Sequence, residues 1–278
     1  MKQGWLLNAA LLVIVTSLAA FVALKPRSDA FSTHRVSRLQ AQQVQHIRLE
    51  RKGDPAVVVE RKQNGWVITA PLSARADTFQ VERLLAILDA TAAHRLSAQD
   101  LARFELDRPA TRITIDGEQF SYGSVNGITR EQYVLAGNAV YALAPRYGAM
   151  IPANLSQLIS KQLFDSTELP VRLELRDFTV TQNADGWRVL PPPAQLSPDD
   201  VNRWLDAWRH AAALRTEPYA GGMPVDSIRM ELRDGKKLRL DVLQTTPDFV
   251  IGRPDEKLRY HFAAQTAKRL LMPPGSQH

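Results

Sequence analysis

Hydrophobic and polar residues alternate with a period of two in three short runs, and this set of runs occurs twice along the chain. The first set is HIRLER, AVVVERK and WVITAP within residues 46–71, and the second is VRLELRD, FTVTQ and WRVLPP within residues 171–192. A period of two is typical of half-buried strands. Asn64-Gly65 and Asp185-Gly186 precede the third run of each set and predict hairpin turns.

A helical pattern follows each set of strands. Apolar residues recur at spacings of three and four, namely Val81, Leu84, Leu85 and Leu88 in the first copy and Val201, Trp204, Leu205 and Trp208 in the second. Asp77 and Ser197 are suited to N-cap positions, with Gln80 and Asp200 three residues later and Pro198 at the first helical position. Each helix is therefore expected to bury one face.

The strand patterns after the helices also correspond. ATRITIDGEQFSYG is matched by DSIRMELRDGKKLRLDV, and QYVLAGNAVYALA by DFVIGRPDEKLRYHFA. We therefore predict a first unit at residues 45–152 and a second unit at residues 170–274, joined by a linker helix at 153–169 and followed by a tail at 275–278. Strands, a helix and further strands in each copy predict an α+β fold of two duplicated, mainly antiparallel units.

The N-terminal region contains an uncharged apolar run, residues 5–24, flanked by Lys2, Lys25 and Arg27. A helix of about 20 residues spans about 30 Å, the hydrocarbon thickness of a bilayer. We predict an uncleaved membrane anchor at residues 1–25 and a polar tether at 26–44. A cleaved signal peptide is the alternative, but its apolar region is normally shorter. The flanking charges leave the orientation in the membrane open.

Composition narrows the classes of function. The net charge is +6, but the basic residues are scattered and no aromatic-plus-basic stripe accompanies them, so we expect no nucleic-acid partner. The chain has no cysteine, which excludes disulfides, thiolate metal sites and a cysteine nucleophile.

Residues 45–165 resemble an uncharacterised bacterial domain family, and the second unit does so more loosely. The resemblance lies in the order of three features: the Gly65-Trp66 pair, RADTFQVERLL at residues 75–85 and EQYV at residues 131–134. Members of this family occur behind a single N-terminal membrane anchor and in the extracytoplasmic part of auxiliary proteins of gliding-motility-type ABC transporters. The resemblance implies a single-pass protein of the bacterial inner membrane with its C-terminal domain in the periplasm. It implies no catalytic residues.

Reactive motifs are absent from the sequence, which has no HExxH, phosphate-binding loop, GxSxG or SxxK pattern. His94 and His210 fall near predicted helix ends, where a cation can complement the helix dipole or face water. Asp199 and Asp200 form a carboxylate pair, but their place in the first turn of a helix favours capping over acid–base chemistry. We therefore predict no catalytic residue, no bound cofactor and no metal site.

Other features have a structural and a functional interpretation. Trp66 and Trp187 are expected to pack against the following helices, although a tryptophan after a glycine turn can also stack on a ligand. The glycines of YGSVNG, residues 122–127, are expected in a loop between strands. The proline run at 191–198 is expected to stiffen a strand-to-helix connection, with docking to a partner as its alternative.

Four arginines recur at equivalent positions of the two copies: Arg83, Arg95, Arg203 and Arg215. They can brace each unit, or they can bind an anionic ligand. The main hypothesis is a non-enzymatic, membrane-anchored periplasmic scaffold or accessory subunit that docks onto an envelope or ABC-transporter complex. The alternative is a binding module that holds an anionic glycan or lipid in a groove between the units, and an enzyme of unfamiliar design remains a third hypothesis.

Overall fold

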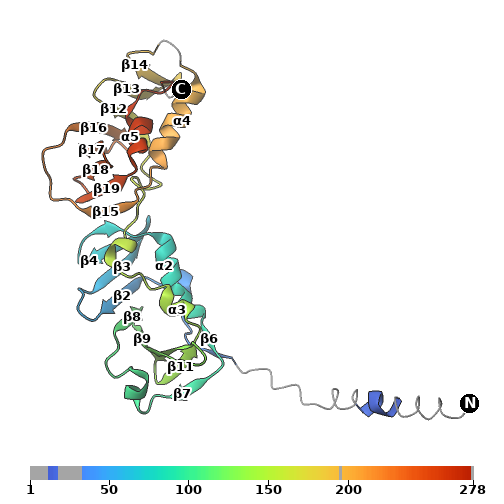
Figure 1. Ribbon diagram of the computed structural model, residues 1–278. Helices are drawn as coiled ribbons and strands as arrows, with labels where there is room; N and C mark the ends of the chain where they lie inside the picture. The colour runs from blue at the N-terminus through green and yellow to red at the C-terminus, as the bar shows by residue number, and fades with distance from the viewer. Residues whose placement is uncertain (1–11, 18–32, 194–195, 277–278) are drawn as a thin grey trace, which may run out of the picture.

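A computed structural model describes residues 12–17, 33–193 and 196–276 of the chain (Figure 1). Most of the predicted membrane span, residues 5–24, lies outside the described residues, and so does the predicted tether up to residue 32; residues 12–17 are helical. Within the described part of the chain, no helix combines the length and the apolar character needed to cross a membrane.

Two large antiparallel sheets make up the body of the protein. In spatial order, the first sheet contains β5 (Ala74–Arg75), β4 (Gly65–Ala70), β3 (Val57–Lys62), β2 (His46–Arg51), β8 (Thr111–Ile115), β9 (Glu118–Val125), β10 (Gln132–Ala136), β11 (Ala139–Leu143) and β7 (Arg95–Ser97). The second sheet contains β14 (Gly186–Leu190), β13 (Thr179–Asn183), β12 (Pro170–Glu174), β16 (Asp226–Leu232), β17 (Lys237–Gln244), β18 (Phe249–Arg253), β19 (Leu258–Phe262) and β15 (Arg215–Pro218).

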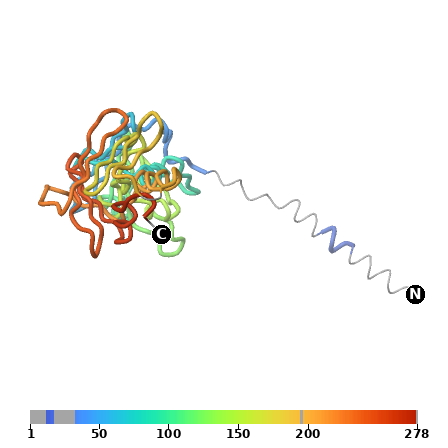
Figure 2. Tube along the Cα trace, turned by 90° about the horizontal axis from the view of Figure 1, so that it is seen from above, coloured from blue at the N-terminus to red at the C-terminus, as the bar shows by residue number. Residues whose placement is uncertain are grey.

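The two sheets have the same strand order. Once β5 is set aside, each strand from β4 to β7 in the first sheet has a counterpart in the second, at the same place and in the same direction. The two sheets lie one above the other in Figure 1 and overlap when the molecule is turned by 90° in Figure 2. The prediction of mainly antiparallel sheets with a few helices is confirmed.

Helices cover one face of each sheet. They are α2 (Thr78–Leu85) and α3 (Arg146–Ala149) in the first unit, and α4 (Pro198–Arg209) and α5 (Ala264–Leu271) in the second. Short 3-10 helices occur at η1 (Ala41–Gln43), η2 (Ala86–Asp89), η3 (Leu101–Phe104) and η4 (Leu155–Gln157). The apolar stripes predicted for α2 and α4 are buried in the core, as amphipathic helices require.

The N-caps of α2 and α4 form as predicted. The Asp77 side chain accepts a hydrogen bond from the Gln80 backbone N–H at 3.1 Å. Ser197 and Asp200 form a full capping box, in which each side chain accepts from the other residue's backbone N–H. These bonds satisfy amides that have no partner within the helix.

The two tryptophans that follow the glycine turns differ in burial. Trp66 is 4% exposed, and the Arg61 guanidinium lies 4.4 Å from the centre of its ring. Trp187 is only partly buried and packs at the margin of the core. The predicted core position therefore holds for Trp66 and is only partly met by Trp187.

The linker at 153–169 is not a helix, contrary to the prediction. Its helical content is the three-residue turn η4, which is capped by the Asn154 side chain through the Gln157 backbone N–H. The linker pairs with both units instead, because Ile159 forms a bridge with Ala76 of the first unit and Gln162 forms one with Ala212 of the second. The Ser160 N–H donates to the Arg75 carbonyl, and the Lys161 carbonyl accepts from the Ala213 N–H, each at 2.8 Å.

Residues 33–44 fold onto the first unit, although the sequence predicted a tether over 26–44. β1 (His34–Arg35) pairs with β6 (Thr91–Ala92), and the side chains of Val36 and Val44 are buried. Most residues of this segment are polar, so its sequence pattern did not indicate that two valines attach it to the first unit.

The linker leads into the second unit as residues 33–36 lead into the first. His34 pairs with Ala92, and Gln162 forms a bridge with Ala212. One backbone hydrogen bond also recurs: Val36 N–H donates to the Ala90 carbonyl, and Leu163 N–H donates to the Ala211 carbonyl. Each unit is therefore preceded by a short extended segment that pairs at the same place.

Candidate functional site

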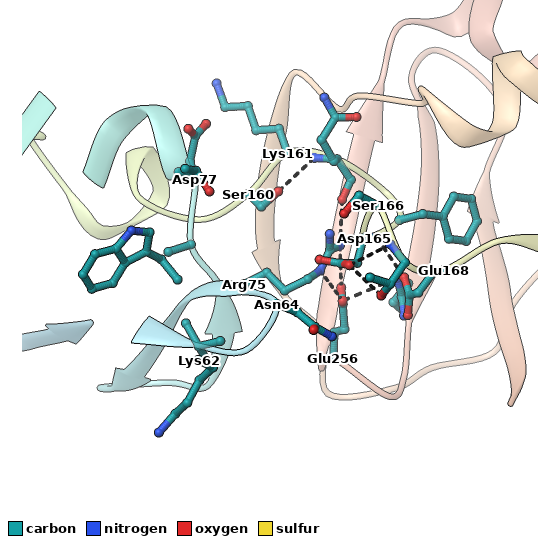
Figure 3. A pocket seen from close by; sticks show the side chains of 18 of the residues that line it. Lys62, Asn64, Arg75, Asp77, Ser160, Lys161, Asp165, Ser166, Glu168 and Glu256 are labelled. Atoms are coloured by element: carbon teal, nitrogen blue, oxygen red, sulfur yellow. Dashed lines mark hydrogen bonds and ion pairs between the residues drawn. The ribbon is translucent and has the colours of Figure 1, made fainter. Parts of the chain in front are cut away.

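A groove of about 730 Å³ lies where the two units meet (Figure 3). One wall comes from the first unit, at the β3–β4 turn and at residues 75–79 before and within α2. The other wall comes from the linker and from two turns of the second unit, including the one between β18 and β19. Its lining includes Arg253, whose side chain is buried, and the partly buried carboxylates Glu168 and Glu256.

Arg253 is the central charge of this groove. It ends β18, its side chain is 0% exposed, and its two terminal nitrogens donate to the Glu168 carboxylate at 2.8 and 2.9 Å. The same guanidinium donates to Asp255 at 2.7 Å and to the Leu163 carbonyl at 2.7 Å. A buried cation is tolerated only when it is paired and hydrogen-bonded in this way.

The charged groups of this cluster shift each other's pKa values. Burial alone would lower the pKa of Arg253, but the hydrogen bonds with Glu168 and Asp255 outweigh it and raise that pKa above its ordinary value. Burial alone would raise the pKa of Glu168, but its hydrogen bonds and charge interaction with Arg253 lower it to about 2. Both groups are therefore ionised at neutral pH.

Arg75 connects the first unit to this cluster. It lies on β5, and its Nε donates to Glu256 at 2.7 Å while a terminal nitrogen donates to the Gln162 carbonyl at 2.7 Å and to the Tyr260 hydroxyl at 3.1 Å. The Tyr260 hydroxyl also donates to Glu256. Figure 3 shows Arg75 and Glu256 pointing toward each other from opposite walls.

The groove has no excess of positive charge. Its cationic lining residues are Lys62, Arg75, Lys161, Lys236 and Arg253. Its carboxylates are Asp77, Asp165, Glu168, Asp234, Asp255 and Glu256. The buried Arg253 and the partly buried Arg75 already donate to carboxylates and carbonyls of the protein, so binding an anion there would require breaking those contacts.

The four recurring arginines lie elsewhere. Arg83 donates to Gln80 on α2, and Arg95 donates to Asn138 across the edge of the first sheet. Arg203 pairs with Asp200 at 3.2 Å, and Arg215 pairs with Glu217. Their local partners fit the bracing interpretation, and none of the four lines the groove formed by the described residues.

The other candidate residues take separate places. Asp200 belongs to the capping box, and Asp199 lies beside it in the first turn of α4. The His210 ring lies 2.9 Å from the Asp206 carbonyl at the end of α4, and the His94 carbonyl accepts from Ala142. Among residues 12–17, 33–193 and 196–276, no three His, Cys, Asp or Glu side chains are grouped so that they could hold a metal ion.

The two loop predictions have different outcomes. YGSVNG, residues 122–127, supplies the last part of β9 through Val125 and then the start of its turn, so the strand runs further than expected. The proline run connects β14 to α4 and ends in Pro198, the first residue of α4, and its residues 194–195 fall outside the described residues.

Sequence reasoning missed the groove residues, although one signal for them was present. The turn between β10 and β11 is the two-residue Gly137-Asn138, whereas the corresponding turn between β18 and β19 is PDEK, residues 254–257. Only one of these two matched hairpins has a charged insertion. The insertion therefore indicates a contact that the second unit makes at this hairpin and the first unit does not.

The fold and the groove define a protein of two like antiparallel sheets, joined through a buried ion-pair cluster and a shared extended linker. The chain belongs to the family described as Domain of unknown function (DUF4340), which it matches over residues 66–216. The match begins at Trp66 and ends within β15, so it includes the linker and most of the first-unit wall of the groove, whereas the second-unit turns that line the groove lie beyond residue 216. No curated protein and no solved structure matches the chain.

Proposed function

We propose that this protein is a membrane-anchored scaffold or accessory subunit of the bacterial cell envelope. Residues 5–24 hold it in the inner membrane, and its two-unit body docks in the periplasm onto a protein complex such as an ABC transporter. The anchor rests on the apolar run, and the location rests on the family resemblance.

The observation that carries the proposal is the set of direct contacts that joins the two units. Arg75 crosses from the first unit to Glu256 of the second, and both units bond to residues 158–163. Tandem domains joined by a flexible linker usually move relative to each other. Here buried charges and backbone hydrogen bonds restrain that motion, which suits a body that must present surfaces at a constant separation.

The charge balance of the groove weighs against the anionic-ligand alternative. A site for an anionic glycan or lipid needs cations with free donors. Arg75 and Arg253 both have carboxylate partners within 3 Å, and carboxylates outnumber cations along the walls of the groove. The groove is therefore better suited to joining the units than to receiving an anion.

Crosslinking in the native cells tests the docking function. The full-length protein is treated with a lysine-reactive crosslinker, the membranes are solubilised, and the co-purifying proteins are identified. The matched control is residues 1–44 alone, which retain the anchor but lack the body. We expect a defined envelope protein to be recovered only with the full-length chain. Recovery of the same proteins with both chains would reject docking by the body.

The absence of cysteine allows a direct test of the proposed location. A single cysteine at Met223, which is 99% exposed, can be labelled in spheroplasts by a membrane-impermeant maleimide. Labelling in intact spheroplasts is expected for a periplasmic body. Labelling only after lysis would place the body in the cytoplasm.

A further inference from the structure

The loop between β9 and β10, residues 126–131, presents an aliphatic tip. Ile128 is 94% exposed, and Val125 at the base of the loop is 51% exposed. The corresponding loop between β17 and β18 has the four residues TTPD, 245–248, and no aliphatic side chain. An exposed aliphatic side chain therefore lies on a loop that is longer in the first unit than in the second, and another ends the strand before that loop.

The backbone of this loop is held in one conformation by Asn126. Its side-chain oxygen accepts from the Ile128 and Thr129 N–H groups at 2.9 and 3.2 Å, and its backbone carbonyl accepts from Arg130 at 2.9 Å. Arg130 has a φ of 64°, a left-handed conformation that is unfavourable for a residue other than glycine. The local hydrogen bonds maintain this conformation.

A small second core supports the loop from below. Asn126 donates to the Tyr133 hydroxyl at 2.9 Å, and the Tyr133 ring lies 4.6 Å from the Phe104 ring. This core consists of Phe104, Leu106 and Val140, with Leu101, Tyr133 and Leu135 at its margin. Gly123 permits its close approach to β9, because a Cβ there would lie 2.1 Å from the Phe104 carbonyl oxygen.

The charge beside the tip indicates the chemistry of a partner. The Arg130 side chain is exposed and forms no ion pair with any residue of the described chain. A β-branched isoleucine on an ordered backbone loses little conformational freedom when it enters a pocket, and a free arginine beside it can bind a carboxylate bidentately. Two aliphatic side chains are a small apolar area for insertion into lipid, but they are sufficient for a specific protein contact.

We propose that the 126–131 loop is the docking element of this protein, and that it binds a protein partner with an apolar pocket for Ile128 and a carboxylate for Arg130. This proposal rests on the docking function proposed above and assigns that function to one surface. The first unit thus contacts the partner, while the charged hairpin of the second unit contacts the first.

The test places a photoreactive amino acid at position 128 or at position 223 of the full-length protein in its native membranes. Met223 is the matched control because it is 99% exposed and lies in the second unit. We expect one adduct from position 128 and none from position 223. Mass spectrometry should map that adduct to a segment of the partner that contains an acidic residue.

Variants then test the two contacts. Ile128→Ser and Arg130→Glu are each expected to lower the yield of the lysine-crosslinked complex about tenfold, as for loss of one buried aliphatic group or one charge pair, whereas Met223→Ser leaves the yield unchanged. Reversing the partner's acidic residue should restore binding of Arg130→Glu. An unchanged yield with Ile128→Ser overturns the loop assignment but leaves docking intact.

Two further outcomes separate the alternatives. If the wild-type protein gives no lysine-crosslinked complex with any protein, the docking function itself is overturned together with the loop assignment. If the position-128 probe attaches only to lipid, and Ile128→Ser lowers flotation of the protein with vesicles of anionic phospholipid, the loop is a membrane contact. That result also overturns the protein-docking assignment.

Discussion

The two units share one strand order but differ in the elements added to it. In the first unit, the connection from β7 to β8 is long and forms the second core under β9 and β10. In the second unit, the corresponding connection is residues 219–225, and the charged turn between β18 and β19 is the added feature. The common fold therefore supplies the framework, and the charged turn added in the second unit lies where that unit meets the first.

The difference also shows how each addition is stabilised. The second core of the first unit is apolar and relies on burial of aromatic and aliphatic side chains. The addition in the second unit relies on buried charges, which cost desolvation unless each has a partner. A single substitution should consequently have a larger effect in the charged cluster than at an exposed ion pair of the same sheet.

Replacing Arg253 should produce the largest loss of stability. Arg253→Met leaves Glu168 and Asp255 without their buried cation, so we expect the free energy of unfolding to fall by about 3–5 kcal/mol. Denaturant unfolding of purified residues 33–278 measures this change. The control is Arg229→Ala, whose side chain is 77% exposed and 3.8 Å from Glu174, and which should change stability by less than about 1 kcal/mol. Equal effects of the two substitutions would contradict the role assigned to the buried cluster.

Acidification should weaken the second unit through Glu168. Its pKa is lowered to about 2 in the folded protein, below the ordinary value of 4.5. A lowered carboxyl pKa gives stability that is fully present above pH 4.5 and is lost as the pH falls toward 2. The lost contribution is on the order of 3 kcal/mol. Unfolding curves at pH 7, 5, 4 and 3 test this. Between pH 5 and 3, the free energy of unfolding should fall less steeply with pH in Glu168→Gln than in the wild type. An equally steep fall would show that other carboxylates cause the acid sensitivity.

The matched tryptophans sharpen the comparison of the two cores. Trp66→Ala should cost about 3–5 kcal/mol because the ring is fully enclosed, whereas Trp187→Ala should cost about 2 kcal/mol less because its ring is partly exposed. The same unfolding assay measures both variants. A larger loss of unfolding free energy for Trp187→Ala than for Trp66→Ala would contradict this ranking, which is based on burial.

The contact between the units should respond to Arg75. Arg75→Ala removes the hydrogen bonds to Glu256 and to the Gln162 carbonyl, at an expected cost of about 1–3 kcal/mol. Spin labels at positions 128 and 223 should give a broader distance distribution in this variant than in the wild type. Arg83→Ala, on α2 but outside the groove, is the control and should leave the distribution unchanged. A narrow distribution in both variants would show that the linker alone fixes the units.

Much of the fold could be predicted from local sequence patterns. The alternating runs, the glycine turns and the caps at Asp77 and Ser197 each reflect interactions within a few residues, and these are readable without tertiary structure. Because the pattern occurs twice, the elements predicted for one unit supported those predicted for the other.

The linker and the groove could not be predicted in the same way. The path of residues 158–163 is set by backbone hydrogen bonds to Arg75 and Ala213, which are distant in sequence. Arg253 is the last residue of an otherwise apolar strand, and its burial depends on Glu168, which is 85 residues away. Such partners become apparent only when the two units are in contact, although the charged insertion in one hairpin was a visible sign.

The extended linker has a mechanical consequence. Tension applied between the ends of the two units would pass along residues 158–163, and it would act on their hydrogen bonds to both units and on the hydrogen bond from Arg75 to the Gln162 carbonyl. The units should therefore separate at a higher force than two domains on a free chain. In single-molecule pulling from residue 33 to residue 276, the wild type should show a discrete separation step that Arg75→Ala shifts to lower force, and identical traces would mean that tension bypasses this strand.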